Sequence, residues 1–191
     1  MAGPRMPRRD HGDDGSLPVI VPRNDKPLVA VSPERVRRLR EHLIKELGEL
    51  RKAKHLDRFA TPERPAPVGF AAMVARSACS LCKGWCCRNG GDDGFLDDRT
   101  LARVRLSNPG MTENALLRLY VDRVPAVAYP DSCIFHGSRG CTLDRSMRAD
   151  VCNSYFCGGV STYLKSEDLE SPTMIIAGEG DKMRTSQVLV P

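Results

Sequence analysis

Apolar residues recur at every third or fourth position between residues 32 and 60, which is the spacing of one face of an α-helix. Ser32-Pro33 is typical of a helix start, because serine caps the first turn and proline fits the first helical position. The pattern stops before Thr61-Pro62, where a proline ends a helix. We therefore predict one long amphipathic helix over residues 32–60. Its apolar stripe comprises Val36, Leu39, Leu43, Leu47 and Leu50, widened by Ile44, Leu56 and Phe59.

This stripe has two interpretations. Most amphipathic helices of globular proteins turn their apolar face towards their own core, so we favour packing on the rest of the chain. The alternative is a protein partner, or a second copy, bound along residues 32–60.

The segments before and after this helix are rich in proline and lack periodicity. Residues 1–31 hold five prolines and mixed charge, and such a segment buries too little apolar surface to offset the entropy lost on ordering. We predict a disordered tail there. Residues 61–69 hold three prolines and end in Gly69, which predicts a linker to a last domain over residues 70–191.

Residues 70–191 show only short patterns. Periodicity predicts helices over residues 96–106 and 113–124, the second capped by Thr112. Apolar pairs on either side of residues 136–140 predict a β-hairpin, and a second hairpin is predicted from 174–177, through a turn at 178–181, to 188–190. The expected fold class is α+β: a small metal-stabilised cysteine-cluster domain of short helices and hairpins, preceded by the long helix and the disordered tail.

Composition narrows the range of functions. The chain has 191 residues, of which 41% are hydrophobic but only 5% aromatic, so its core is light in large rings. No run approaches the ~20 apolar residues of a membrane span, and the first residues lack the apolar stretch of an export signal. We therefore expect a cytoplasmic protein without a membrane partner. The net charge of +5 is too small to indicate nucleic acid as a partner.

Eight cysteines are confined to residues 79–157, whereas structural cysteines scattered through a core would not cluster in this way. Stable disulfides are uncommon in a reducing compartment, and clustered cysteines there more often bind metal or carry out redox chemistry. We expect these cysteines to act as thiolate ligands of zinc or iron, as single ions or as an iron–sulfur cluster, since both accept all-thiolate ligation. The cysteines form two groups in sequence: Cys79, Cys82, Cys86 and Cys87, then Cys133, Cys141, Cys152 and Cys157.

The spacing of the first group suggests how it divides. On a continuous helix, at about 100° per residue, Cys79, Cys82 and Cys86 fall within roughly 60° of one another. Cys87 then points about 100° away from Cys86, so it serves a second metal, bridges two metals, or is a buried bystander. Gly84 weakens the helix, and in a tighter knuckle Cys79 and Cys82 still converge.

The second group also has reasons to converge. The predicted hairpin brings Cys133 and Cys141 to the outer ends of two paired strands. Residues 148–157 form a short helix or turn that supplies Cys152 and Cys157. Two groups of four cysteines could form two tetrahedral metal sites, or one iron–sulfur cluster that leaves some thiols unused.

Other residues near the cysteines have weaker cases. His136 is a fourth ligand, a general base or a solvated turn residue, and we favour the last. Trp85, the only tryptophan, is expected to pack over the site. The basic residues either offset the negative charge of a thiolate-bound metal or are solvated, and we favour solvation for all of them except Arg148. They are Lys83, Arg88, Arg139, Arg145 and Arg148.

Four features stand in a characteristic order: C-x2-C-x3-C-C from Cys79 to Cys87, Cys133-Ile-Phe, Cys141-Thr-Leu, and Arg148 ahead of Cys152 and Tyr155-Phe156. This order resembles the YkgJ-type cysteine-cluster family, over about residues 75–160. Ala149 departs from the family, which usually has proline there. The resemblance implies a zinc- or iron-chelating domain, a description that carries no established activity. Flagellin lysine N-methylases carry a similar cluster, which implies protein methyl transfer as an alternative.

Three functions therefore remain open, and a metal-binding protein with a structural or metal-handling purpose is favoured. An enzyme with a metal or iron–sulfur centre is the second. Against it, the sequence has no glycine-rich cofactor loop and neither H-E-x-x-H nor G-x-S-x-G, and eight ligands suggest closed sites. The third, a disulfide-stapled protein, disagrees with the expected compartment and with the adjacent Cys86-Cys87.

Overall fold

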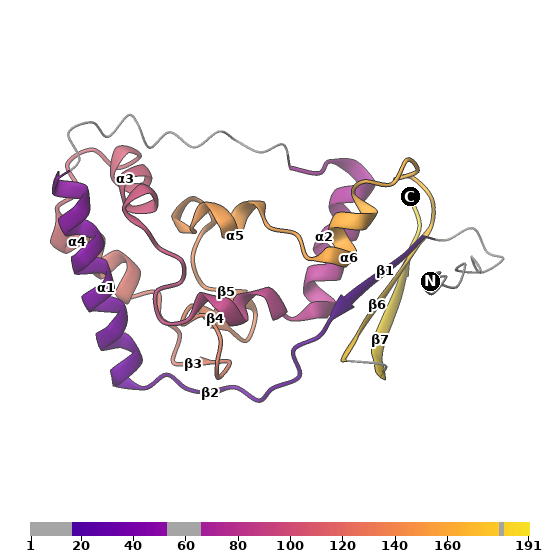
Figure 1. The fold of residues 1–191 in the computed structure, drawn as a ribbon, viewed down its shortest axis with the longest axis horizontal. Helices are drawn as coiled ribbons and strands as arrows, with labels where there is room; N and C mark the ends of the chain where they lie inside the picture. Colours follow the sequence, from indigo (N-terminus) through magenta and orange to yellow (C-terminus); the bar gives the residue numbers. More distant parts are fainter. Residues whose placement is uncertain (1–16, 53–65, 180–181) are drawn as a thin grey trace, which may run out of the picture.

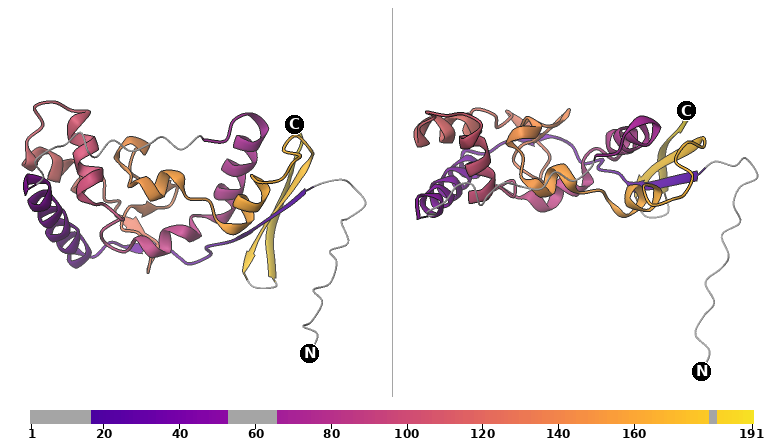
Figure 2. Two further views of the ribbon diagram at one scale, coloured as in Figure 1. Left: turned by 45° about the horizontal axis from the view of Figure 1, so that its top comes forward. Right: turned by 90° about the horizontal axis from the view of Figure 1, so that it is seen from above.

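A computed structural model describes residues 17–52, 66–179 and 182–191 of the chain. The molecule is elongated: three helices gather at one end, a three-stranded sheet lies at the other, and the segments that carry the cysteines lie between them (Figures 1 and 2). Each end has its own apolar core. This mixture of helices and small sheets confirms the α+β class.

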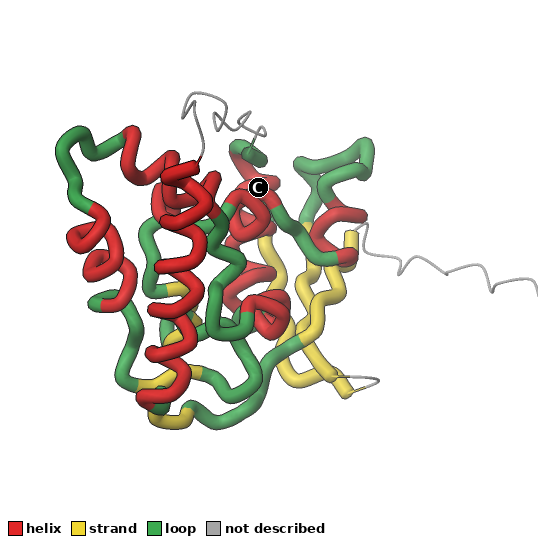
Figure 3. Tube along the Cα trace, turned by 60° about the vertical axis from the view of Figure 1, so that its left-hand side comes forward, coloured by secondary structure: helices red, strands yellow, loops and turns green. Residues whose placement is uncertain are grey.

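The predicted amphipathic helix is α1 (Pro33–Lys52). Its first turn is capped by the Ser32 hydroxyl, which accepts a hydrogen bond from the Arg35 backbone N–H at 3.4 Å. The leucines of the stripe pack against α3 (Asp98–Leu106) and α4 (Glu113–Val121) at the helical end, seen in front in Figure 3. Packing on the chain's own core is therefore confirmed up to Lys52, and residues 53–60 lie outside the described residues. The buried leucines are Leu39, Leu43, Leu47 and Leu50.

The prediction of a disordered tail is wrong for residues 17–31. Strand β1 (Leu17–Pro22) pairs in parallel with β6 (Thr173–Glu179), which pairs in antiparallel with β7 (Lys182–Leu189). The side chains of Val19 and Val21 are buried in the core between the sheet and its helices. This burial, together with six residues paired with β6, offsets the entropy lost when the segment becomes ordered. The flanking prolines are tolerated because β1 is an edge strand. Residues 1–16 lie outside the described residues.

Helices α2 (Gly69–Cys82) and α6 (Gly158–Tyr163) pack on one face of this sheet. Phe70, Val74 and Ala78 of α2 are buried in the same core as Val19 and Ile175. Since α2 begins at Gly69, the predicted linker is shorter at its C-terminal end, and its residues 61–65 lie outside the described part. The sheet therefore holds the helix whose last turns carry the first two cysteines.

The remaining predicted elements are present with shifted ends. Thr112 caps α4, its hydroxyl accepting from the Ala115 N–H at 3.2 Å. The first hairpin is formed by β4 (His136–Gly137) and β5 (Gly140–Cys141), and the second by β6 and β7, which pair over a longer stretch than predicted. The other short elements are β2 (Val29–Ala30), β3 (Val127–Ala128), α5 (Asp150–Ser154) and two 3₁₀ helices, η2 (Trp85–Gly90) and η3 (Arg145–Met147).

Candidate metal centre

The first cysteine group does not lie on one continuous helix. Helix α2 ends at Cys82, and Lys83 (φ 52°) and Gly84 (φ 66°) both adopt the left-handed conformation before η2 begins. Glycine enters this conformation without steric cost and ends helices for that reason. The angular argument from a continuous helix is therefore wrong beyond Cys82, because Cys86 and Cys87 lie on a new turn with its own direction.

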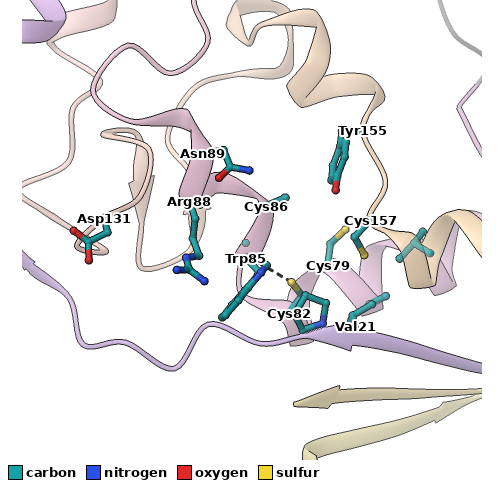
Figure 4. Close-up of a pocket in the computed structure, with 14 residues that line it drawn as sticks. Val21, Cys79, Cys82, Trp85, Cys86, Arg88, Asn89, Asp131, Tyr155 and Cys157 are labelled. Atoms are coloured by element: carbon teal, nitrogen blue, oxygen red, sulfur yellow. Dashed lines mark hydrogen bonds between the residues drawn. The ribbon is translucent and has the colours of Figure 1, made fainter. Parts of the chain in front are cut away.

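Four thiols nevertheless line a single cavity of about 430 Å³. We call Cys79, Cys82, Cys86 and Cys157 the open set (Figure 4). Helix α2 supplies the first two, η2 supplies the third, and the fourth stands at the N-cap of α6. In Figure 4 the sulfurs of Cys79 and Cys157 lie side by side. The Trp85 backbone N–H donates to the Cys82 sulfur at 3.4 Å.

Protonation of the open set follows from burial. The pKa of Cys82 is raised to about 12, mainly by burial; the hydrogen bond from the Trp85 N–H opposes this rise, and the neighbouring thiols Cys86, Cys157 and Cys79 contribute to it. Burial likewise raises the pKa of Cys79 to about 11, with Cys86 and Cys157 as the next causes, because its thiol lies inside the cavity although the residue as a whole is exposed. Without a cation these two thiols are protonated at neutral pH, so a metal has to displace their protons to bind.

The other four thiols form a second group, which we call the inner set: Cys87, Cys133, Cys141 and Cys152. Burial raises the pKa of Cys133 to about 12, and Cys141 and Cys152 are its neighbouring thiols. Burial also raises the pKa of Cys152 to about 11, with Cys141 and then Cys86 as the next causes, so Cys152 has a thiol neighbour in each set. The Cys133 N–H donates to the Cys87 carbonyl at 2.8 Å, which ties η2 to the hairpin region.

Cys86 and Cys87 join the two sets through one peptide bond. The Cys87 thiol donates a hydrogen bond to the Cys86 sulfur, which lowers the pKa of Cys86 and raises that of Cys87. Cys86 lines the open cavity, whereas Cys87 has Cys133 and Cys141 as further thiol neighbours. The structure thus separates Cys87 from Cys79 and Cys82, as the sequence suggested, and it separates Cys157 from Cys152, which the sequence did not.

The donor chemistry of both sets fits zinc or iron, but the thiols are not yet arranged as a coordination shell. Over the described residues, no three cysteine, histidine, aspartate or glutamate side chains stand in a grouping that would hold a metal ion as they are. All eight cysteines are free of disulfides. Metal ligation therefore stays a prediction, and zinc with Zn–S bonds of about 2.3 Å would require the open cavity to contract.

His136 differs from its favoured interpretation as a solvated turn residue. It lies in β4 and is 1% exposed, its Nδ1 lies 2.8 Å from the Ser132 hydroxyl, and its ring centroid is 4.6 Å from that of Tyr129. Burial lowers the pKa of this imidazole. The prediction failed because the hairpin closes around Ser138-Arg139, so His136 belongs to a strand rather than to the turn.

The other candidate residues divide between site and scaffold. Trp85 lines the open cavity, with the Arg88 guanidinium 4.2 Å from its ring centroid. Arg148 donates from Nε to the Leu143 carbonyl at 2.9 Å, so it braces the backbone, and its charge also opposes the rise in the pKa of Cys152. The sequence interpretation missed Asn89, Asp131 and Tyr155 as lining residues, and only the aromatic pair at Tyr155-Phe156 offered a signal.

The chain matches no family model, no curated protein and no solved structure. The likeness to YkgJ-type proteins therefore stays an expectation drawn from the cysteine order. Of the described helices, none combines the length and the apolar character that a bilayer crossing demands.

Proposed function

We propose that the protein binds zinc or iron through its eight cysteine thiolates, in two centres formed by the open set and the inner set. The observation that carries this proposal is the cavity into which Cys79, Cys82, Cys86 and Cys157 converge from three separate elements. Four thiols at one cavity are the ligand number of an all-cysteine zinc site or of an iron–sulfur cluster. The cysteine order, which resembles that of YkgJ-type proteins, supports the same proposal.

The surroundings of the two sets are compatible with the charge of such centres. A zinc ion with four thiolates, or a four-thiolate iron–sulfur cluster in its common state, carries a formal charge of about −2. Arg88 lines the open cavity, and the charge of Arg148 acts on Cys152 of the inner set. Each centre therefore has a cation to offset part of its charge.

The choice between zinc and iron is open in this proposal. A cavity of about 430 Å³ is wider than one ion with four thiolates requires, which favours a larger cluster or a contraction on zinc binding. Three members of the inner set, Cys87, Cys133 and Cys141, pack in the same apolar cluster as Phe135 and Leu143, whereas Cys152 is exposed.

Metal analysis tests the proposal directly. The protein is purified without oxygen, and its zinc, iron and acid-labile sulfide are measured beside its visible absorption spectrum. We expect either about two zinc equivalents, four thiolates each, or iron with matching sulfide and broad visible absorption. The double variant Cys82→Ser/Cys133→Ser, with one ligand removed from each set, is the matched control and should lose most of the metal. A wild-type protein whose eight thiols all react with a thiol reagent, and which holds no metal, would refute the proposal.

A second candidate function is an enzyme that uses the open set as a reactive centre, such as a protein methyl-transfer enzyme. The observation that favours it is the free volume beside the thiols, together with the polar side chains of Asn89, Asp131 and Tyr155 on the cavity wall. Closed structural sites leave no such room. Tyr155→Phe and Asn89→Ala separate the two functions, because a purely structural centre keeps its metal and loses nothing else. Ligand-induced changes in the cluster spectrum of the wild type, absent in these variants, would favour the enzyme.

A further inference from the structure

A second, smaller cavity of about 180 Å³ lies between the C-terminal end of α2 and the β4–β5 hairpin. Only Cys79 and Gly84 are shared with the wall of the larger cavity, so this space is separate from the inner set and only touches the open set. Its polar wall consists of two cations, three hydroxyl groups and one imidazole. They belong to Lys83 and Arg139, to Ser80, Tyr129 and Ser138, and to His136.

The buried imidazole of His136 forms the floor of this cavity. The hydrogen bond between Nδ1 and the Ser132 hydroxyl (2.8 Å) and the tilted contact with the Tyr129 ring (interplanar angle 44°) fix the ring. Its other nitrogen, Nε2, lies against Gly84, only 2.5 Å from where a Cβ at that position would stand. Within the described part of the chain Nε2 forms no hydrogen bond to protein, and it is not sealed from solvent, because Asn153 Oδ1 is the one buried side-chain polar atom without a partner there. A ring nitrogen that faces a cavity and has no protein partner is free to bond a ligand.

The charges around this floor are of one sign. Lys83 and Arg139 both line the cavity, and no carboxylate is among its lining residues in the described chain. The Asp25 carboxylate, which does not line the cavity, lies 3.8 Å from the Lys83 ammonium. Lys83 also holds the left-handed position after α2 (φ 52°), where glycine is strongly preferred. A lysine held in a disfavoured conformation suggests that its side chain is needed there.

We propose that this cavity binds a small oxyanion, of the size and charge of phosphate or sulfate, between His136, Lys83 and Arg139. In the required tautomer the Ser132 hydroxyl donates to Nδ1 and the Nε2–H donates to the anion. Ser80 and Ser138 offer further donors at the rim. The volume of about 180 Å³ admits one phosphate group but not a whole nucleotide. The anion is therefore either free or the terminal phosphate of a phosphomonoester.

Phosphate titration of the full-length protein, with its metal content measured in every sample, tests this site. Inorganic phosphate is added while ¹⁵N signals of the histidine side chains and the heat of binding are recorded. We expect saturable binding with a shift of the His136 Nε2 signal. Lys83→Gly keeps the fold, because glycine adopts the left-handed backbone conformation at this position. Lys83→Gly and Arg139→Ala should each weaken phosphate binding at least tenfold. Arg76→Ala removes an exposed cation of α2 that does not line the cavity, and it should bind as the wild type.

The possible outcomes distinguish a phosphomonoester from a free anion, and both of these from the absence of an anion site. Tighter binding of phosphoserine than of inorganic phosphate would identify a phosphomonoester, and the reverse order would identify a free anion. Absence of saturable binding by phosphate, sulfate and phosphoserine would overturn the proposal. An equal loss of affinity in Arg76→Ala would also overturn it, since the effect would then come from overall charge.

Discussion

Two neighbouring glycines of α6 offer a sharp test of how the sheet supports the open set. At Gly159 a Cβ would stand 1.9 Å from the Ile20 carbonyl oxygen of β1, whereas at Gly158 a Cβ would meet nothing within 4 Å. Gly159→Ala therefore forces α6 and β1 apart by about 1 Å, since real Cβ contacts stay at about 3 Å or more and both partners are backbone. Cys157, at the N-cap of α6, moves with it.

The expected costs of the two substitutions have opposite signs. Overpacking of this kind destabilises by about 1–3 kcal/mol. Gly158→Ala removes a flexible residue from a helix at an open position, so it should be neutral or stabilise by up to about 1 kcal/mol.

Urea unfolding of both variants, followed by circular dichroism at matched metal content, measures this difference. Gly159→Ala should also bind less metal, because Cys157 leaves its place beside Cys79. Equal unfolding midpoints for the two variants would refute the close approach of α6 to β1, and with it the ordered state of residues 17–22.

Three further predictions concern the thiols and their neighbours. Cys157→Ser and Cys82→Ser should each remove the metal of the open set, whereas Cys152→Ser should remove the metal of the inner set. Metal analysis of the single variants will check this. Identical losses in all three variants would argue for one shared cluster. Without metal, buried Cys82 and Cys133 have folded-state pKa values of about 12 against an ordinary value near 9. Their protonated form therefore stabilises the fold at neutral pH, and urea midpoints of metal-free protein should fall as pH rises from 9 towards 12. Gly84→Ala strains a left-handed residue (φ 66°) and drives a Cβ into the buried imidazole, so it should cost about 2–4 kcal/mol in the same assay, and an unchanged midpoint would contradict that contact.

Features with local signals were predictable from the sequence. The stripe of α1, the Thr112 cap of α4 and both hairpins depend on residues close together in the chain, so periodicity and turn residues were sufficient. Strand β1 could not be found in this way, because its partner β6 lies at the far end of the sequence and its prolines are tolerated only at a sheet edge.

Clustering in sequence identified the eight cysteines as one group, and the structure brings four of them to one cavity. Their role as metal ligands stays a prediction. Their division into two sets depends on the change of chain direction at Lys83 and Gly84 and on the packing of α6 against the sheet. Neither can be predicted from the spacing of the cysteines in the sequence. The buried state of His136 was missed for a similar reason, since a shift of two residues in the turn moves it from solvent into the wall of a cavity.

The parallel pairing of β1 with β6 has a consequence for biosynthesis. Strands β6 and β7 follow the last cysteine in the chain, so all eight thiols emerge from the ribosome before the sheet that supports α2 can exist. Such long-range pairing forms late. During this interval the thiols are accessible to metal, oxidant and other nascent chains, and the open set forms only when the last strands have been added. The proposed metal centre of the open set can therefore form only after the sheet is complete.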